Sequence, residues 1–165
     1  MTPEAAFDQY SQLVYRFVYR VTRREDVAED VTQDTFLALI RSPERWSAAR
    51  GSMKTYLLAI ARNLMLKRFR DYRNEEQLDI DDDSASDPRG VLEISAAVAD
   101  AIASLPALQQ EAVVLFEYEG VTLEELAQIV AADVGTVKSR LHRARARLRR
   151  SLGPYRMGVK THGTI

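Results

Sequence analysis

Apolar side chains recur at helical spacing along most of the chain, and no stretch alternates as a half-buried strand does. A first helix places six apolar residues on one face: Phe7, Tyr10, Val14, Phe17, Val18 and Val21. A second runs from about Glu25 to Ile40 and ends before Pro43. A third carries Tyr56, Leu57, Ile60 and Ala61, and a separate basic segment follows it over residues 64–73.

The helical pattern stops after residue 73 and resumes near residue 94. The interval is rich in Asp, Ser, Pro and Gly, a composition that cannot bury enough apolar surface to fold alone. Four further helices are predicted after it. The pattern therefore predicts an all-α fold of two small helical domains. Their expected bounds are 1–73 and 92–153, with a flexible acidic linker at 74–91 and a frayed tail at 154–165.

The second domain contains a predicted helix-turn-helix. Thr122 and Glu125 have the spacing of a capping box, and a short apolar-faced helix follows them. Residues 131–133 make a tight connection to a helix that is rich in Lys and Arg. Two short helices joined by so brief a turn, the second one basic, are typical of this DNA-binding motif.

The basic helix has an apolar stripe that includes Val137, Leu141 and Ala144. Small residues lie opposite that stripe, and long cations flank them on both sides. Such a helix can enter the major groove, because the small residues allow close approach while the cations reach phosphates and base edges. A basic amphipathic helix can also lie on an anionic membrane or only solvate a surface. The preceding capping box and turn favour DNA.

Two other constellations are open to more than one interpretation. On the second helix, acidic and amide side chains share one side, and Phe36, Leu37 and Ile40 crowd the last turn. Those apolar residues either dock a partner or pack under the first helix. Residues 62–73 interleave cations with Phe69 and Tyr72, which suits opened nucleic acid but also a solvated helix.

Charge and composition narrow the classes of function. The net charge of −1 conceals two basic stretches, residues 1–73 and 101–165, on either side of an acidic one. The chain has no cysteine, so disulfides and thiolate metal sites are excluded. It shows no signal peptide and no apolar run near the roughly 20 residues that span a bilayer. We expect a cytoplasmic protein without membrane insertion, metal, cofactor or catalytic residues; His142 and His162 are not spaced as a metal site.

Taken in order, these motifs resemble the extracytoplasmic-function (ECF) group of the sigma-70 family of bacterial RNA polymerase initiation factors. Residues 26–36 look like the region 2 helix that docks on the polymerase clamp, and residues 56–63 look like the region 2 helix that leads to the −10 element loop. Residues 121–148 are similar to region 4, which reads the −35 element. Two positions depart from the family pattern: Tyr56 replaces a usual Trp, and Asp133 replaces a common Pro.

The resemblance implies three sets of site residues. The set expected to bind polymerase is Asp26, Glu29, Asp30, Gln33 and Phe36. The set expected to bind the opened −10 strand is Arg62, Asn63, Lys67, Arg68 and Phe69. The set expected to bind the −35 duplex is Thr136, Lys138, Ser139, Arg140, His142, Arg143 and Arg147.

The expected function is therefore promoter-directed transcription initiation without catalysis by the chain itself. The expected partners are core RNA polymerase, promoter DNA and an anti-sigma factor. The alternative is a stand-alone helix-turn-helix regulator whose first half senses a ligand or dimerises. An enzyme is a more distant possibility.

Overall fold

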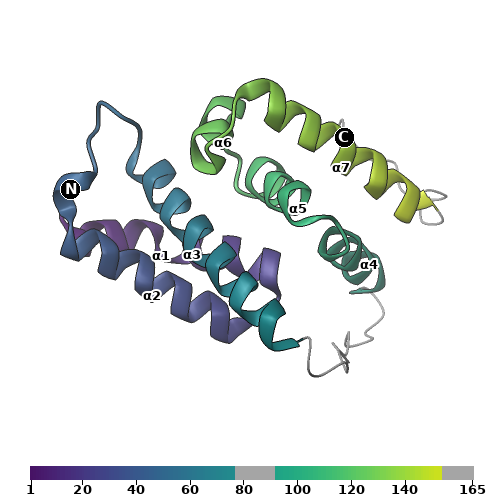
Figure 1. Cartoon of the computed structure of the whole chain (residues 1–165), viewed down its shortest axis with the longest axis horizontal. Coiled ribbons are helices and arrows are strands. Elements are labelled where there is room, and N and C mark those ends of the chain that lie inside the picture. Colours follow the sequence, from purple (N-terminus) through teal and green to yellow (C-terminus); the bar gives the residue numbers. More distant parts are fainter. Residues whose placement is uncertain (77–91, 154–165) are drawn as a thin grey trace.

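The computed structural model describes residues 1–76 and 92–153, with side chains described over 1–68 and 95–153. Within those residues the chain is helical and contains no strand, as predicted (Figure 1). The elements are α1 (Pro3–Thr22), α2 (Glu25–Arg41), the short 3₁₀ turn η1 (Pro43–Arg45), α3 (Met53–Glu76), α4 (Leu92–Ala103), α5 (Ala107–Val113), the π-helical turn η2 (Val114–Tyr118), α6 (Leu123–Val130) and α7 (Val134–Ser151). Most of the predicted linker and the predicted tail lie outside the described residues.

Helix α1 begins and ends where its sequence provides caps. Thr2 is the N-cap, and its hydroxyl accepts a hydrogen bond from the Ala5 N–H at 3.1 Å. Pro3 occupies the first helical position, where its missing N–H has no helical partner to lose. The helix ends at Arg23, which adopts the left-handed conformation. The apolar face predicted for this helix packs against α2 and α3.

Helix α3 differs from the prediction of two separate segments. It is one continuous helix, and it extends beyond residue 73 to Glu76. The Ser52 hydroxyl caps its start by accepting the Thr55 N–H at 3.1 Å. No Gly or Pro interrupts residues 53–76, so the polar Asn63 is accommodated on the exposed side of the helix without breaking it.

The second half packs α5 and α6 against α7, and α4 lies beside α5. Pro106 is the N-cap residue of α5, and the chain then widens into η2 rather than continuing as a regular helix. The Glu119 N–H donates to the Val114 carbonyl at 3.1 Å, five residues back, as the π-helical turn requires. This wider turn was not predicted.

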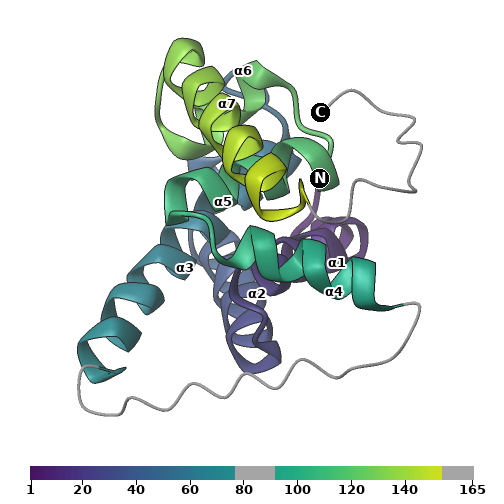
Figure 2. The same ribbon diagram turned by 90° about the vertical axis from the view of Figure 1, so that its right-hand side faces the viewer.

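The two halves contact each other directly. Helix α3 packs against α6, and α1 packs against both α4 and η2. Figure 2 shows α4 next to α1, although the two helices are far apart in sequence. Buried residues of both halves belong to one apolar cluster. Within the described residues, no helix is both long enough and apolar enough to cross a membrane.

Candidate nucleic-acid and polymerase interfaces

The predicted helix-turn-helix is confirmed in its local geometry. The Thr122 hydroxyl accepts the Glu125 N–H at 3.1 Å, and the Glu125 carboxylate accepts the Thr122 N–H at 3.3 Å. Ala131 ends α6 in the left-handed conformation, which reverses the chain within three residues. Asp133 then starts α7 as its N-cap. A hydrogen-bonded cap therefore stands on each side of the turn, because the Ala131 N–H donates to the Ala127 and Gln128 carbonyls and Asp133 caps α7.

Asp133 holds the first turn of α7 through a short hydrogen bond. Its carboxylate accepts the Thr136 N–H at 2.7 Å. Hydrogen bonds from Thr136 hold the pKa of the Asp133 carboxyl below its usual range, and the charge of Arg140 adds to this effect. The acid in place of the family's common Pro is thus a capping residue.

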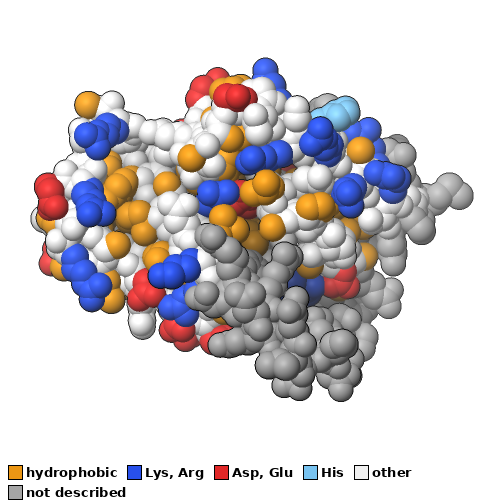
Figure 3. All heavy atoms as spheres, viewed as in Figure 1, with side chains coloured by type: hydrophobic (Ala, Val, Ile, Leu, Met, Phe, Trp, Pro, Cys, Tyr) orange, Lys and Arg blue, Asp and Glu red, His pale blue; other side chains and the backbone are white. Residues whose placement is uncertain are grey.

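The outer face of α7 is cationic and open to solvent. Lys138, Ser139, His142 and Arg143 are exposed and line a shallow hollow on the surface. Arg147 is exposed one turn further along, and Thr136 is half-buried. Figure 3 shows Lys, Arg and His side chains gathered over α7. Within the described part of the chain, none of these cations forms an ion pair. The charges are available to a phosphate backbone.

Two arginines of α7 turn toward the protein instead. Arg140, expected among the −35 residues, is half-buried, and its Nη1 is buried without a hydrogen-bond partner among the described atoms. Arg145 donates to Glu117 at 3.0 Å and lies over the Phe116 ring. The face open to solvent is therefore centred on Arg143 rather than on Arg140.

The residues expected to bind the −10 strand lie along α3, and they differ in availability. Asn63 and Lys67 are exposed. Asn63 lies in the middle of α3, so its expected position at a helix end, at the entrance to a loop, is wrong. The side chain of Phe69 lies outside the described residues.

Arg62 is held by the second half of the chain. Its Nε and Nη2 donate to the two carboxylate oxygens of Glu111 on α5, at 2.9 and 3.0 Å. The Arg62 side chain is 14% exposed and that of Glu111 is 1% exposed. Sequence reasoning missed Glu111. The sequence feature that could have revealed it is the position of this acid directly before the apolar run 112–116. A carboxylate buried in such a run requires a cationic partner.

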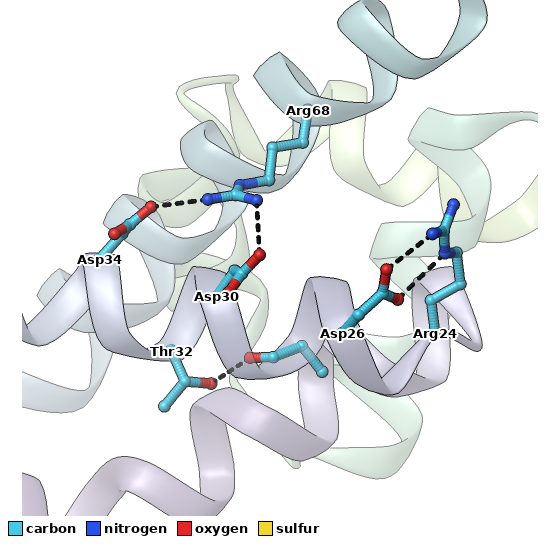
Figure 4. A network of polar contacts seen from close by, with 7 residues as sticks. Arg24, Asp26, Asp30, Thr32, Asp34 and Arg68 are labelled. Carbon is cyan, nitrogen blue, oxygen red and sulfur yellow. Dashed lines mark hydrogen bonds and ion pairs between the residues drawn. The ribbon is translucent and has the colours of Figure 1, made fainter.

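Arg68 is also paired, but near the surface. It donates to Asp30 at 3.1 Å and to Asp34 at 2.8 Å, and both carboxylates belong to α2 (Figure 4). This joins one residue expected to bind the −10 strand to one expected to bind polymerase. The two predicted surfaces are therefore neighbours on the molecule.

The surface of α2 carries four of the five residues expected to bind polymerase. Asp26, Glu29, Asp30 and Gln33 are exposed along it. Asp26 accepts two hydrogen bonds from Arg24 at 3.1 and 2.7 Å, and the Arg24 side chain lowers the pKa of the Asp26 carboxyl (Figure 4).

Phe36, the fifth residue, is buried. Its ring is 4% exposed and meets the Phe7 ring edge-on at a centroid distance of 5.0 Å. Ile40 is 56% exposed and Phe7 is 47% exposed. Leu37, the residue after Phe36, is also exposed. Phe36 thus packs under α1, while the expectation that Ile40 also packs there is wrong. Docking of a partner on the exposed residues stays a prediction.

Comparison with known proteins follows the same division of the chain. A family model of sigma-70 region 2 matches residues 6–75, and one of sigma-70 region 4 matches residues 95–148. The ECF RNA polymerase sigma factor SigK of Mycobacterium sp. (strain KMS) is 30% identical over 158 residues, covering 90% of this chain and 82% of SigK. The chain belongs to the ECF group of the sigma-70 family.

Two further sigma factors extend the comparison. The ECF sigma factor BldN of Streptomyces coelicolor is 33% identical over 154 residues, which cover 88% of this chain. The chain spans 58% of the length of BldN. The sigma factor RpoE of Bartonella quintana, solved in complex with the anti-sigma factor NepR, has a TM-score of 0.78 and 27% identity. The match covers 91% of this chain and 96% of RpoE.

Proposed function

We propose that this ECF sigma factor binds core RNA polymerase and directs it to promoters. The single observation that carries the proposal is the open cationic face of α7, placed by a helix-turn-helix in a chain that also matches region 2. Membership of the family supports both the polymerase partner and the absence of catalysis by the chain itself. These partners imply a cytoplasmic place of action.

The proposal assigns each surface one role. Helix α7 binds the −35 duplex through Lys138, Ser139, His142, Arg143 and Arg147, with Thr136 and Arg140 at the edge. Helix α3 binds the opened −10 strand through Asn63 and Lys67, with Arg62, Arg68 and Phe69 beside them. Helix α2 binds polymerase through Asp26, Glu29, Asp30 and Gln33, and Phe36 supports that surface from below. The corresponding domains are 1–73 and 92–153.

An anti-sigma factor is the proposed regulatory partner. RpoE of Bartonella quintana, which shares the fold over most of this chain, was solved bound to one. The exposed apolar residues Phe7, Leu37 and Ile40 offer contact area for polymerase or for such a regulator.

Transcription with purified core polymerase tests the function. Run-off transcription over a library of genomic fragments should yield discrete start sites only when this protein is added. The variant Lys138→Ala/Arg143→Ala should lose those starts, while a matched variant at exposed Arg149, outside the assigned residues, should keep them.

Mobility shifts separate this function from that of a stand-alone regulator. Fragments that give starts should shift with the protein and core polymerase together, and much less with the protein alone. Equally tight binding to duplex DNA in the absence of polymerase would favour the stand-alone regulator.

A further inference from the structure

The first turn of α7 combines a helix end that attracts anions with an acidic side chain. The helix begins at Val134, and Asp133 is its N-cap. The first N–H groups of a helix have no partner within it, and the helix dipole adds positive potential there, so phosphates commonly bind at such an end. In this chain the Asp133 carboxylate occupies that place, because it accepts the Thr136 N–H at 2.7 Å.

Asp133 also begins a row of side chains along one edge of α7. At about 100° per residue, spacings of three and four residues place this row between the buried stripe and the outer face of the helix. The row consists of an acid, a hydroxyl and three cations: Asp133, Thr136, Arg140, Arg143 and Arg147. The charge of Arg140 acts on the Asp133 carboxyl, which agrees with their shared edge. This edge is therefore cationic except at its start.

The negative charge at this start has no ion-pair partner. Asp133 is exposed, and it forms no ion pair within the described part of the chain. Its pKa is held below the usual range, mainly by hydrogen bonds from Thr136, so the carboxyl is ionised at neutral pH. A negative charge thus stands in solvent beside the cations that bind duplex DNA under the proposed function.

The backbone beside Asp133 is open to a DNA strand. Gly135, the second residue of α7, is exposed and has no side chain that could keep a strand away. In a helix-turn-helix, the recognition helix lies in the major groove with its N-terminal residues toward the DNA. A strand phosphate near this end would therefore meet the first-turn N–H groups and the Asp133 carboxylate together.

We propose that Asp133 excludes a strand phosphate from the first turn of α7 and so limits the sequence-independent part of −35 binding. Its oxygen takes one N–H that a phosphate would use, and its charge repels the phosphate itself. Lys138 and Arg143 then hold the duplex without a phosphate anchored at the end of the helix. The inference rests on the proposed −35 role of α7.

Binding of the chain alone to duplex DNA tests the exclusion. The probe is a short labelled duplex of mixed sequence, and fluorescence anisotropy gives its affinity over a series of salt concentrations. Asp133→Asn keeps an oxygen to cap Thr136 but removes the charge, so it should bind about threefold to tenfold more tightly at low salt. Its plot of log affinity against log salt should be steeper by about one, because one more phosphate is contacted. Asp133→Pro, which also lacks the charge, should bind more tightly than the parent too.

Asp8→Asn is the matched control. Asp8 is likewise an exposed acid without an ion pair among the described residues, but it lies on α1 in the other half of the chain. The substitution changes the net charge by the same amount, and it should leave duplex binding unchanged. Two results would overturn the proposal: binding by Asp133→Asn that is no tighter than the parent's, or an equal gain in Asp8→Asn.

Polymerase complexes show whether Asp133 acts on a phosphate or on a base. Promoter fragments found by run-off transcription can be varied one position at a time across the −35 segment and footprinted. Asp133→Asn should gain the same factor on every fragment. A change confined to one base pair would overturn the proposal, because a carboxylate that accepts from an exocyclic amino group reads sequence. A lack of start sites in the run-off experiment would overturn the proposed function instead, while binding by the chain alone would still decide the exclusion.

Discussion

Helices α3 and α7 both carry rows of cations, but they present them differently. Lys138, Arg143 and Arg147 on α7 are exposed and form no ion pair within the described residues. On α3, Arg62 and Arg68 both bind carboxylates of other helices. Arg143 and Arg147 of α7 are thus unpaired among the described residues, whereas Arg62 and Arg68 of α3 are occupied.

This difference shows that the count of basic residues does not measure binding capacity. Affinity for a polyanion comes from cations that replace its counterions, and a cation held by a carboxylate must first be released. Under the proposed function, the exposed cations of α7 can therefore bind duplex DNA directly. On α3, Arg62 and Arg68 would first have to leave their carboxylates, whereas Asn63 and Lys67 are already exposed.

The largest effect is expected at the centre of the α7 face. Arg143→Ala should weaken binding of the polymerase complex to a −35 element by about 1–3 kcal/mol, because a cation that reads a base edge is lost. Binding should be measured by footprinting over a series of salt concentrations. If Arg143 contacts only phosphate, all sequences should weaken alike and the salt slope should flatten.

Arg149→Ala provides the control on the same helix, since Arg149 is exposed but lies about two turns beyond His142, toward the end of α7 and outside the assigned residues. It should change −35 binding far less. Equal losses for the two variants would mean that α7 acts only through total charge, and the comparison with α3 would then lose its basis.

A smaller effect is expected at Asn63. Asn63→Ala should slow promoter opening by an amount equivalent to about 1 kcal/mol, the typical worth of one hydrogen bond, if its amide reads an unstacked base. Opening should be followed on duplex promoters with permanganate footprinting. On a template already melted at −10 the defect should shrink and not vanish, because unpairing is no longer needed but the contact is still missing. Opening at the parent rate on the duplex would remove Asn63 from the site.

A smaller effect again is expected at Arg68, on the free energy of unfolding. Arg68→Gln is expected to lower the free energy of unfolding by only about 0–1 kcal/mol, because Arg68 and both its acidic partners are well exposed. Urea denaturation at low and high salt measures it, and salt should reduce the difference. A loss much larger than this would make the pairs with Asp30 and Asp34 structural, and α3 would then be permanently occupied there.

The smallest effect is expected at Asp133. Its folded-state pKa is lowered, so its charge stabilises the fold above its ordinary pKa of about 4, and this contribution is lost as the pH falls through the folded-state pKa. Asp133→Asn keeps an oxygen to cap Thr136 but removes the charge. Its melting temperature should lie slightly below the parent's at pH 7 and meet it in acid. A constant difference at all pH values would contradict the role of the charge.

Much of the fold could be predicted from local signals. The capping box at Thr122 and the turn before Asp133 are short-range patterns, and they placed α6 and α7 correctly. The continuity of α3 could not be predicted as surely, because a polar residue such as Asn63 ends a helix in one context and lies on its exposed side in another. The π-helical turn η2 was missed for a similar reason, since its residues also fit an ordinary helix.

The sequence predicts which residues of the candidate site share a helix face. It predicts less well which of those side chains are exposed in the folded chain. Periodicity defines a helix face but not what that face contacts, so it did not distinguish buried Phe36 from exposed Ile40. The pairing of Arg62 was also out of reach, because Glu111 lies 49 residues away in sequence and belongs to the other half. Only tertiary structure joins such residues.

The long sequence separation of these ion pairs has a consequence for synthesis of the chain. Arg62 and Glu111 are 49 residues apart, and Arg16 and Glu119 are 103 apart, so each half can form from local contacts before the two meet. Domains fold in order as the ribosome extends the chain, at roughly 5–20 residues per second. Each newly made molecule therefore passes through several seconds in which Arg16 and Arg62 lack their carboxylate partners, and these two cations are then open to any polyanion nearby.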